Sequence, residues 1–354
     1  MKGLILSGGK GTRLRPLTYT AAKQLVPVAN KPVLFYAIED LVGAGITDIG
    51  IIVGDTADQI RAAVGDGSRF GARITYIPQD RPAGLAHAVG MARGFLGDDR
   101  FVMYLGDNFI REGITPLVRD FAEGAANARI LLYRVPNPSG FGVAVLEGDR
   151  VVRLVEKPRE PVSDLAIVGV YLFDHHIFEA VAGIAPSARG ELEITDAIQW
   201  LLDHGYDVQA QELEGYWIDT GKMEDMLEAN RLVLEVMRPS VRGTVDDRSK
   251  LTGMVAIEEG AEIVNSVLRG PLIIGANTRV IDSYVGPFTA IDHDCLLEGI
   301  EIANSIVLEY SRIEDIEHRI EDSLIGRYAE VRRSPAKPRA YKLLLGDHSK
   351  VVVL

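Results

Sequence analysis

Residues 2–16 read KGLILSGGKGTRLRP and predict a buried strand that runs directly into a glycine-rich loop. Glycine tolerates positive φ, so successive amide groups of such a loop can point at one anion. A P-loop needs Ser or Thr after Gly-Lys, and a dinucleotide fingerprint needs a third glycine where Leu14 stands. Both of those loops are excluded. An anion-binding loop of another kind and a plain glycine-rich turn stay open.

Short apolar runs and longer amphipathic stretches alternate up to the segment around residue 235. This alternation predicts an α/β fold with a Rossmann-like, mostly parallel sheet covered by helices. Ligands of such sheets bind beyond the carboxyl ends of the strands, so residues that follow the apolar runs are the first site candidates. The expected strands are 2–6, 48–53, 73–77, 101–105, 129–135, 142–146, 151–155, 167–173 and 207–213, and the expected helices are 31–44, 56–65, 84–95, 114–123, 175–182 and 195–204.

The pattern changes after a helical stretch at 223–237. Aliphatic residues and glycines then recur at about six-residue intervals, which predicts a small parallel β-helix, with an antiparallel β-domain as the alternative. The expected organisation is a first domain over 1–238, a polar linker over 239–250, the β-helix over 251–334 and a tail over 335–354. The apolar end of that tail (VVVL) is expected to form a strand on an existing sheet edge.

The composition excludes several classes of protein. The 354 residues carry 50 acidic against 38 basic side chains, a formal net charge of −12, which argues against a general nucleic-acid binder. The one cysteine, Cys295, excludes an intrachain disulfide and a cysteine metal cluster. No apolar run reaches the roughly 18 residues of a membrane span, and the start of the chain does not resemble a signal peptide. We therefore expect a cytoplasmic protein.

Four charged residues stand where phosphates and a metal ion could bind. Arg13 lies in the glycine-rich loop and Lys23 soon after it, and fixed cations stabilise a triphosphate under attack. Asp107 and Asp219 each follow a short apolar run, and Mg²⁺ is held by one or two carboxylates plus phosphates and water. Each aspartate alone could equally be a turn or cap residue, and their wide separation does not show that they meet.

Further polar residues suit a nucleoside base and a sugar phosphate. The amide of Gln79 carries both a donor and an acceptor, as a pyrimidine edge requires, and Gly84 could let the backbone approach the base. Gly142 could admit a hexose, Glu156 could accept sugar hydroxyls, and Lys157 could pair with a phosphate. From these residues alone, a loop glutamine, an ordinary helix start and a surface ion pair are the simpler interpretations.

The motifs together resemble the signature of sugar nucleotidyltransferases. They are LSGGKGTRLRP at 6–16, KQLVPV at 23–28 and Lys31-Pro32. The chain is most similar to the long branch of glucose-1-phosphate thymidylyltransferases, and the resemblance covers essentially its whole length. It implies a nucleotidyltransferase domain followed by a left-handed parallel β-helix. It also implies Mg²⁺-dependent transfer of a nucleotidyl group from dTTP to glucose 1-phosphate by single displacement, with release of pyrophosphate.

The resemblance also implies roles for individual residues. Arg13 and Lys23 would be catalytic, and Asp107 and Asp219 would hold the metal. Nucleotide-binding residues would be Gly8, Gly9, Gly11, Thr12, Arg13, Gln24, Gln79, Gly84 and Asp107; sugar-phosphate-binding residues would be Gly142, Glu156, Lys157 and Ile167. The segment 189–196 would lie near the pocket, with Thr195 as a helix cap, whereas His87 is interpreted as a helix residue that is not a catalyst. Ser7 stands where many relatives have alanine, and Phe141 replaces the tyrosine common in the short branch; both could alter sugar preference.

Several alternatives stay open. The same chemistry could use UTP or another nucleotide, or a pseudo-sugar 1-phosphate. An acyltransferase activity of the β-helix is a different class of function, but its repeat is short and His293 and His318 lie in acidic stretches. A catalytically silent binding protein is a third hypothesis. Loss of Arg13, Lys23 or either aspartate would favour it, but all four residues are present. Partners are expected to be small molecules and further copies of this chain in a dimer or tetramer, not nucleic acid or a membrane.

Overall fold

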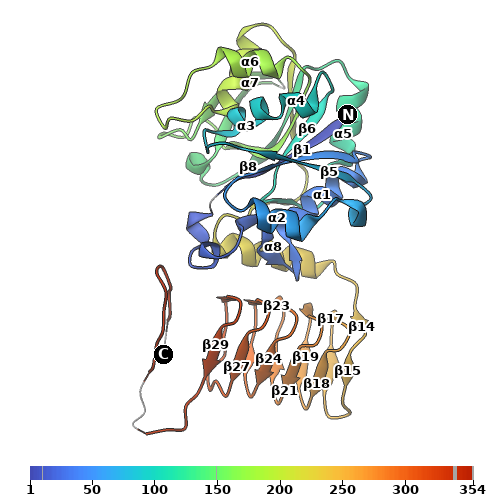
Figure 1. The fold of residues 1–354 in the computed structure, drawn as a ribbon, viewed down its shortest axis with the longest axis vertical. Helices are drawn as coiled ribbons and strands as arrows, with labels where there is room; N and C mark the ends of the chain where they lie inside the picture. Colours follow the sequence, from blue (N-terminus) through green and yellow to red (C-terminus); the bar gives the residue numbers. More distant parts are fainter. Residues whose placement is uncertain (10, 149, 338–340, 353–354) are drawn as a thin grey trace. The chain divides into compact units, whose positions relative to one another are not determined.

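The computed structural model describes residues 1–9, 11–148, 150–337 and 341–352, which pack as two compact units. The first unit comprises Met1–Lys10, Ala22–Leu25 and Val33–Asp219. The second comprises Gly11–Ala21, Val26–Pro32 and Thr220–Leu354. Figure 1 shows the helices and large sheet of the first unit in blue to green, and the stacked strands of the second in yellow to red.

A nine-stranded sheet forms the centre of the first unit, with the strand order β5-β4-β1-β6-β11-β8-β12-β10-β9. Only β11 and β10 run against the other strands, so the predicted α/β sheet is confirmed as mostly parallel, with two reversed strands. The strands are β5 (Arg73–Pro78), β4 (Asp48–Val53), β1 (Lys2–Ser7), β6 (Phe101–Leu105), β11 (Leu165–Phe173), β8 (Ala128–Arg134), β12 (Val208–Glu212), β10 (Arg150–Glu156) and β9 (Gly142–Glu147).

Helices cover both faces of this sheet, because alternate residues of each strand point to opposite sides. In β1, Leu4 and Leu6 join one buried cluster, and Ile5 joins the other. Burial of each such aliphatic side chain stabilises the folded state by roughly 1.5–3 kcal/mol relative to leaving it exposed. The helix expected over 84–95 is split at Ala92, next to two glycines that lower helix propensity. The helices are α1 (Val33–Gly43), α2 (Ala57–Val64), α3 (Leu85–Met91), α4 (Arg93–Leu96), α5 (Thr115–Glu123), α6 (Ile177–Gly183) and α7 (Ile194–Asp203).

The second unit contains three sheets in which every pairing between successive strands is parallel. Ile257, Ile274, Ile291 and Val307 stand in register on successive coils, and all four are fully buried. Parallel coils that bury aliphatic residues on their neighbours are typical of a β-helix, so the antiparallel alternative is wrong.

The three sheets share the same coils. The first contains β14 (Ser240–Val241), β17 (Val255–Ile257), β20 (Leu272–Ile274), β23 (Thr289–Ile291), β26 (Ile306–Val307) and β28 (Leu324–Ile325). The second contains β15 (Thr244–Val245), β18 (Glu262–Val264), β21 (Arg279–Ile281), β24 (Leu296–Glu298), β27 (Arg312–Glu314) and β29 (Glu330–Arg332). The third contains β16 (Lys250–Thr252), β19 (Val267–Arg269), β22 (Tyr284–Val285) and β25 (Glu301–Ile302).

The first coil begins inside the predicted linker. Strands β14 and β15 and the start of β16 fall within 239–250. These strands are short and their side chains are mostly exposed, so the segment is polar although it is paired. The linker expected from composition is therefore the opening turn of the β-helix.

Helix α8 (Met223–Glu235) belongs to the second unit, although the sequence grouped 1–238 as one domain. Asn230, which is fully buried, accepts a hydrogen bond from the Ala29 amide at 2.9 Å and donates one to the Phe288 carbonyl at 2.8 Å. Asn30 donates to the Ile291 carbonyl at 2.7 Å. Hydrogen bonds thus connect helix α8 and the β2–β3 turn (Pro27–Val28, Lys31–Pro32) to the β-helix.

The tail does not form the expected strand in its described part. Residues 341–352 contain no strand, and Val351 and Val352 are exposed to solvent, without a neighbouring strand to pair with. Residues 353–354 of the apolar end lie outside the described residues. Within the described ranges, no helix is long and apolar enough to cross a membrane.

Candidate active site

Two aspartates from distant parts of the first unit meet at one lysine. Asp107 follows β6, and a two-stranded sheet of β7 (Asn108–Ile110) and β13 (Trp217–Asp219) sets Asp219 opposite Asn108. The buried Lys23 ammonium forms an ion pair with Asp107 Oδ2 and lies 3.5 Å from Asp219 Oδ1. The two carboxylates therefore share one cationic centre at the carboxyl edge of the parallel strands.

The charge of Lys23 keeps Asp107 ionised. Burial on its own would raise the pKa of this carboxyl group, but the Lys23 charge and hydrogen bonds from Lys23 and Asn108 outweigh it and lower the pKa below its ordinary value. A carboxylate that stays charged near neutral pH suits a metal ligand.

Asn108 holds this arrangement together, and sequence reasoning gave it no role. Its Nδ2 donates to Asp107 Oδ1 at 3.0 Å, while its Oδ1 accepts hydrogen bonds from Trp217 Nε1 at 2.5 Å and from the Gly169 amide at 3.2 Å. A Cβ on Gly169 would lie 2.5 Å from Asn108 Oδ1, so only glycine fits there. An asparagine placed directly between Asp107 and the apolar pair Phe109-Ile110 was the available signal for a buried polar connection.

Two residues next to the glycine-rich loop carry buried polar atoms without partners. Within the described residues, Ser7 Oγ and Gln24 Oε1 are buried and make no hydrogen bond. A Cβ on Gly9 would lie 3.5 Å from Gln24 Nε2, and one on Gly8 would lie 2.9 Å from Gln79 Oε1. Buried polar groups are normally paired, so unpaired ones beside a glycine-rich loop suit a site that a ligand completes.

The base side of the candidate site lies at the carboxyl end of β5. The backbone N–H of Gln79 donates to the Val53 carbonyl at 2.9 Å, which fixes the backbone at this point. Gly84 has φ 103°, and a Cβ there would lie 2.8 Å from the Leu192 amide nitrogen. A recess of about 310 Å³ lies beside it and is lined by Arg81, Pro82, Ala83, Pro186, Gly190 and Leu192.

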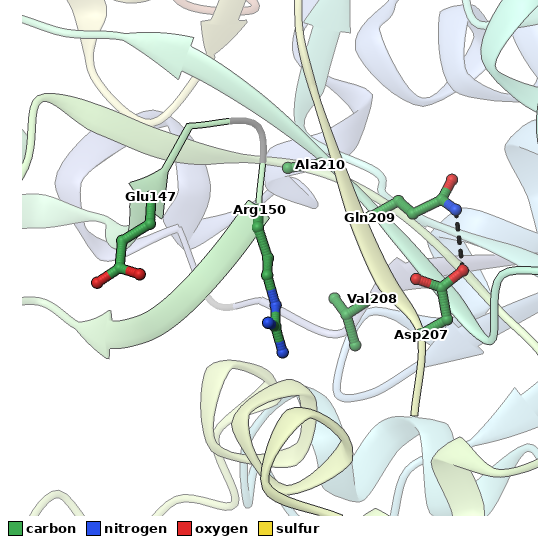
Figure 2. A pocket seen from close by; sticks show the side chains of 6 residues that line it. All are labelled: Glu147, Arg150, Asp207, Val208, Gln209 and Ala210. Carbon is green, nitrogen blue, oxygen red and sulfur yellow. Dashed lines mark hydrogen bonds between the residues drawn. The ribbon is translucent and has the colours of Figure 1, made fainter. Parts of the chain in front are cut away.

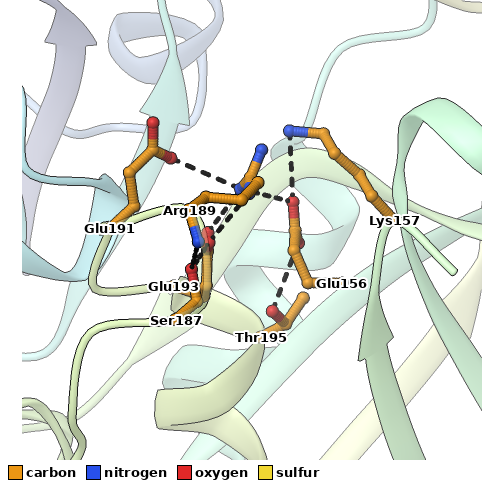
Figure 3. A network of polar contacts seen from close by, with 7 residues as sticks. All are labelled: Glu156, Lys157, Ser187, Arg189, Glu191, Glu193 and Thr195. Atoms are coloured by element: carbon orange, nitrogen blue, oxygen red, sulfur yellow. Dashed lines mark hydrogen bonds and ion pairs between the residues drawn. The ribbon is translucent and has the colours of Figure 1, made fainter.

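The sugar-phosphate candidates form one polar network, shown in Figure 3. Glu156 Oε1 lies 3.2 Å from both Lys157 Nζ and the Arg189 guanidinium, and Glu156 Oε2 accepts a hydrogen bond from Thr195 at 3.2 Å. Arg189 also pairs with Glu193 at 2.7 Å. Lys157 is partly exposed, so its ammonium is accessible to an anionic ligand. Sequence reasoning left Arg189 without a defined role, although its segment was singled out.

Gly142 and Ile167 place this network beside the aspartates. A Cβ on Gly142 would lie 2.6 Å from Thr195 Cγ2, 3.1 Å from Glu156 Oε2 and 3.4 Å from Ile167 Cδ1. Strand β11 carries both Ile167 and Gly169, whose amide contacts Asn108. Strand β11 therefore contributes a residue next to the sugar-phosphate candidates and another that contacts Asn108, the partner of Asp107.

The remaining predicted residues, Gly11, Thr12 and Arg13, belong to the second unit. Gly11 has φ 61° and precedes a short 3₁₀ helix, η1 (Thr12–Leu14), and the Thr18 hydroxyl donates to the Gly11 carbonyl at 2.6 Å. The Arg13 guanidinium occupies the space that a Cβ on Gly221 would need. Lys10 of the signature lies outside the described residues.

The same short segment packs on the end of the β-helix. In η2 (Leu17–Tyr19), Leu17 Cδ2 lies 2.9 Å from the position of a Cβ on Gly326. The ring centroid of Tyr19 lies 6.0 Å from that of His348 in the tail. Residues near the start and the end of the chain are thus in contact within the second unit.

A larger recess, of about 480 Å³, lies elsewhere in the first unit, where it is lined by Glu147, Arg150 and residues 207–210 (Figure 2). Val208 pairs with Ala128 at the amino end of β8, the opposite edge of the sheet from the aspartates. No predicted site residue lines this recess, so its size does not make it the active site.

Comparison with known proteins identifies the family. A family model described as nucleotidyl transferase matches residues 2–236. The chain belongs to the nucleotidyl transferase family. Over its full length, this nucleotidyl transferase is 58% identical to a glucose-1-phosphate thymidylyltransferase of Streptomyces griseus, of which it covers 99%. It is 49% identical to the low-salt glycan biosynthesis nucleotidyltransferase Agl11 of Haloferax volcanii, over 99% of each chain.

A solved structure is similar to the N-terminal part of this nucleotidyl transferase. It is a Bacillus anthracis protein, named as a candidate glucose-1-phosphate thymidylyltransferase, in complex with sucrose. The two are 39% identical with a TM-score of 0.64, and the match covers 68% of this chain and 98% of that one. The relatives that match the whole chain therefore represent a longer form of the family.

Proposed function

We propose that the protein transfers a thymidylyl group from dTTP to glucose 1-phosphate, giving dTDP-glucose and pyrophosphate. The full-length likeness to a protein named for that reaction supports the substrates, and the site supports the chemistry. The phosphate of the sugar attacks the α-phosphorus of dTTP directly. No protein nucleophile is needed, because a phosphate held in position is already reactive.

The observation that carries this proposal is the meeting of Asp107 and Asp219 at Lys23. In the proposed reaction, Lys23 and Arg13 stabilise the negative charge of the triphosphate as it is attacked. Lys157 holds the sugar phosphate, and Glu156 accepts hydrogen bonds from the sugar hydroxyls. Gln79 and Gly84 are assigned to the base, and Gly142 and Ile167 to the hexose. Gly8, Gly9, Gly11, Thr12 and Gln24 are assigned to nucleotide binding.

The two aspartates suit a divalent metal ion. Two carboxylates that converge on one cation provide the hard oxygen ligands of Mg²⁺, with phosphates and water as further ligands. Mg²⁺ held by Asp107 and Asp219 would offset the charge on the phosphates when bound. We expect Mg²⁺ to raise the melting temperature of the wild type and not of Asp107→Asn or Asp219→Asn, because binding to the folded state alone stabilises it.

The proposal extends to the whole protein. The large sheet and its helices would form the nucleotidyltransferase domain, and the coils that begin at β14 would form a left-handed β-helix. The protein would be a cytoplasmic dimer or tetramer without nucleic-acid or membrane partners. The same chemistry with UTP, another nucleotide or a pseudo-sugar 1-phosphate is the alternative. Acyl transfer by the β-helix alone and a silent binding function are the remaining hypotheses, and neither of them predicts release of pyrophosphate.

The test is pyrophosphate release with glucose 1-phosphate and each of dTTP, UTP, dCTP and dATP. The wild type should prefer dTTP, and Asp107→Asn should lose at least about 100-fold in kcat, because the site then holds one carboxylate fewer at the phosphates. Asp98→Asn, at an exposed aspartate nearby in sequence, is the matched control and should retain full activity. A folded Asp107→Asn protein with unchanged activity would overturn the assignment.

A further inference from the structure

We propose that His87 and Asp80 fix the orientation of the Gln79 amide and thereby make the site selective for 4-oxo pyrimidines, thymine and uracil, over cytosine. This inference rests on the proposed role of Gln79 in binding the base. It assigns His87 and Asp80 as positioning residues that do not touch the substrate.

The three side chains form a chain of contacts in the first unit. Gln79 Nε2 lies 3.2 Å from His87 Nδ1, and His87 Nε2 lies 3.4 Å from Asp80 Oδ1. His87 is largely buried in the first turn of α3, whereas Asp80 is mostly exposed. The backbone of Gln79 is fixed by its hydrogen bond to Val53, so rotation of the amide is the remaining freedom.

Asp80 determines which nitrogen of His87 carries the proton. In a neutral imidazole one nitrogen donates and the other accepts. A carboxylate oxygen beside Nε2 favours the tautomer that is protonated there, because the partly positive N–H then faces the negative oxygen. His87 Nδ1 is left as an acceptor, and it accepts a hydrogen bond from Gln79 Nε2.

This acceptor determines which atom of the Gln79 side-chain amide points toward the glycine-rich loop. Gln79 Oε1 points toward Gly8, since a Cβ there would lie 2.9 Å from it. An amide with its oxygen forward accepts a hydrogen bond from N3–H of thymine or uracil, and its second N–H can donate to the adjacent carbonyl. Cytosine has an acceptor at N3 and an amino group at C4, so it needs the reversed amide. Reversal would set Oε1 against the lone pair of His87 Nδ1.

The experiment measures equilibrium binding of dTTP, UTP and dCTP by calorimetry without sugar phosphate, so that it does not depend on turnover. His87→Phe removes the acceptor and keeps a ring of similar size. We expect the dCTP:dTTP ratio of Kd values to fall roughly tenfold, as loss of one oriented hydrogen bond predicts, with UTP weakening in parallel with dTTP. Asp80→Ala should lower the ratio to a smaller extent.

Two variants separate orientation of the amide from support of the fold. His87→Gln restores an acceptor and should return the ratio to within about threefold of the wild type. His175→Phe replaces an exposed histidine that follows β11 at the opposite edge of the sheet and should leave the ratio unchanged. A folded His87→Phe protein with an unchanged ratio, or with equal weakening for all three nucleotides, would overturn the inference. Wild-type protein that prefers dTTP in binding but releases no pyrophosphate would overturn the proposed function alone.

Discussion

Lys23 and Asp107 form a buried charge pair whose two members depend on each other. The ammonium holds the pKa of Asp107 below its ordinary value against the opposing effect of burial. Without that ammonium, burial is left as the largest influence and raises the pKa of Asp107. The site therefore links ionisation of one carboxyl group to the free energy of unfolding.

We expect Lys23→Met to lower the free energy of unfolding most at neutral pH. A carboxyl group whose pKa is depressed by folding stabilises the protein above its unfolded pKa of about 4, and this stability is lost as the pH falls through the folded value. The difference between wild type and Lys23→Met should therefore shrink from pH 7 toward pH 3. Urea denaturation at a series of pH values measures it, and a difference that grows toward acid contradicts the charge pair.

For single residues, the sequence could predict that the two aspartates lie at strand ends, but not which residue orients them. Asp107 and Asp219 each follow an apolar run, so their positions at strand ends could be read directly. The role of Asn108 depends on its contacts with Gly169 and Trp217, which are distant along the chain. Contacts of that kind have no local periodicity, so they are visible only in the fold.

Among the elements, the β9–β10 pair sets the space available to the sugar. Gly142 stands opposite Glu156 in this pair, and its missing side chain leaves room between Glu156, Thr195 and Ile167. Any Cβ would have to displace Thr195 or Glu156 from the network around Arg189. The width of this gap is thus set by Gly142, a residue without a side chain that could identify it as part of a binding site.

Gly142→Ala should lower kcat/KM for glucose 1-phosphate by roughly tenfold or more, because small displacements of positioning groups are costly. Gly140→Ala is the matched control two residues earlier, since a Cβ there meets no atom within 4 Å. Steady-state kinetics with saturating dTTP compares the two variants. Equal kinetics for both would show that the gap at Gly142 does not limit sugar binding.

Long secondary-structure elements can be predicted from sequence patterns, whereas very short ones cannot. The long strands of the first unit repeat with a period of two or form fully apolar runs, and they lie close to their predicted positions. Strands β7 and β13 have three residues each, and β14 and β15 have two, which is too short for any period to emerge. Those short pieces form the candidate metal site and the first coil.

At the scale of the molecule, Asn230 connects segments of the second unit that are far apart in sequence. Its side chain accepts from Ala29 and donates to Phe288, and it is fully buried. Removing it leaves a partly buried amide and a partly buried carbonyl without their partner. Each such loss costs about 1–3 kcal/mol.

Asn230→Ala should therefore lower the free energy of unfolding by about 2 kcal/mol or more. Glu228→Ala lies on the same helix at an exposed position and loses only a surface ion pair with Arg231, worth at most about 1 kcal/mol. Chemical denaturation of the full chain compares the two. A loss for Asn230→Ala no larger than that for Glu228→Ala would contradict the connecting role.

The architecture of each unit could be predicted, whereas the assignment of segments to units could not. Alternation of strands and helices indicated the sheet, and the six-residue rhythm indicated the β-helix. The short pieces 11–21 and 26–32 lie between strands of the first unit in sequence, yet they pack with the second. Their partners, such as Ile291 and Gly326, lie far away along the chain, and no local pattern reports them.

The contacts of Leu17 with Gly326 and of Tyr19 with His348 have a consequence for biosynthesis. During translation the segment that carries Arg13 is made before every strand of the β-helix, so Gly326 and His348 are added to the chain later. A nascent chain halted before the final coil contains every strand of the large sheet but lacks these two contacts. The segment next to the signature loop therefore gains both contacts only after Gly326 and His348 have been synthesised.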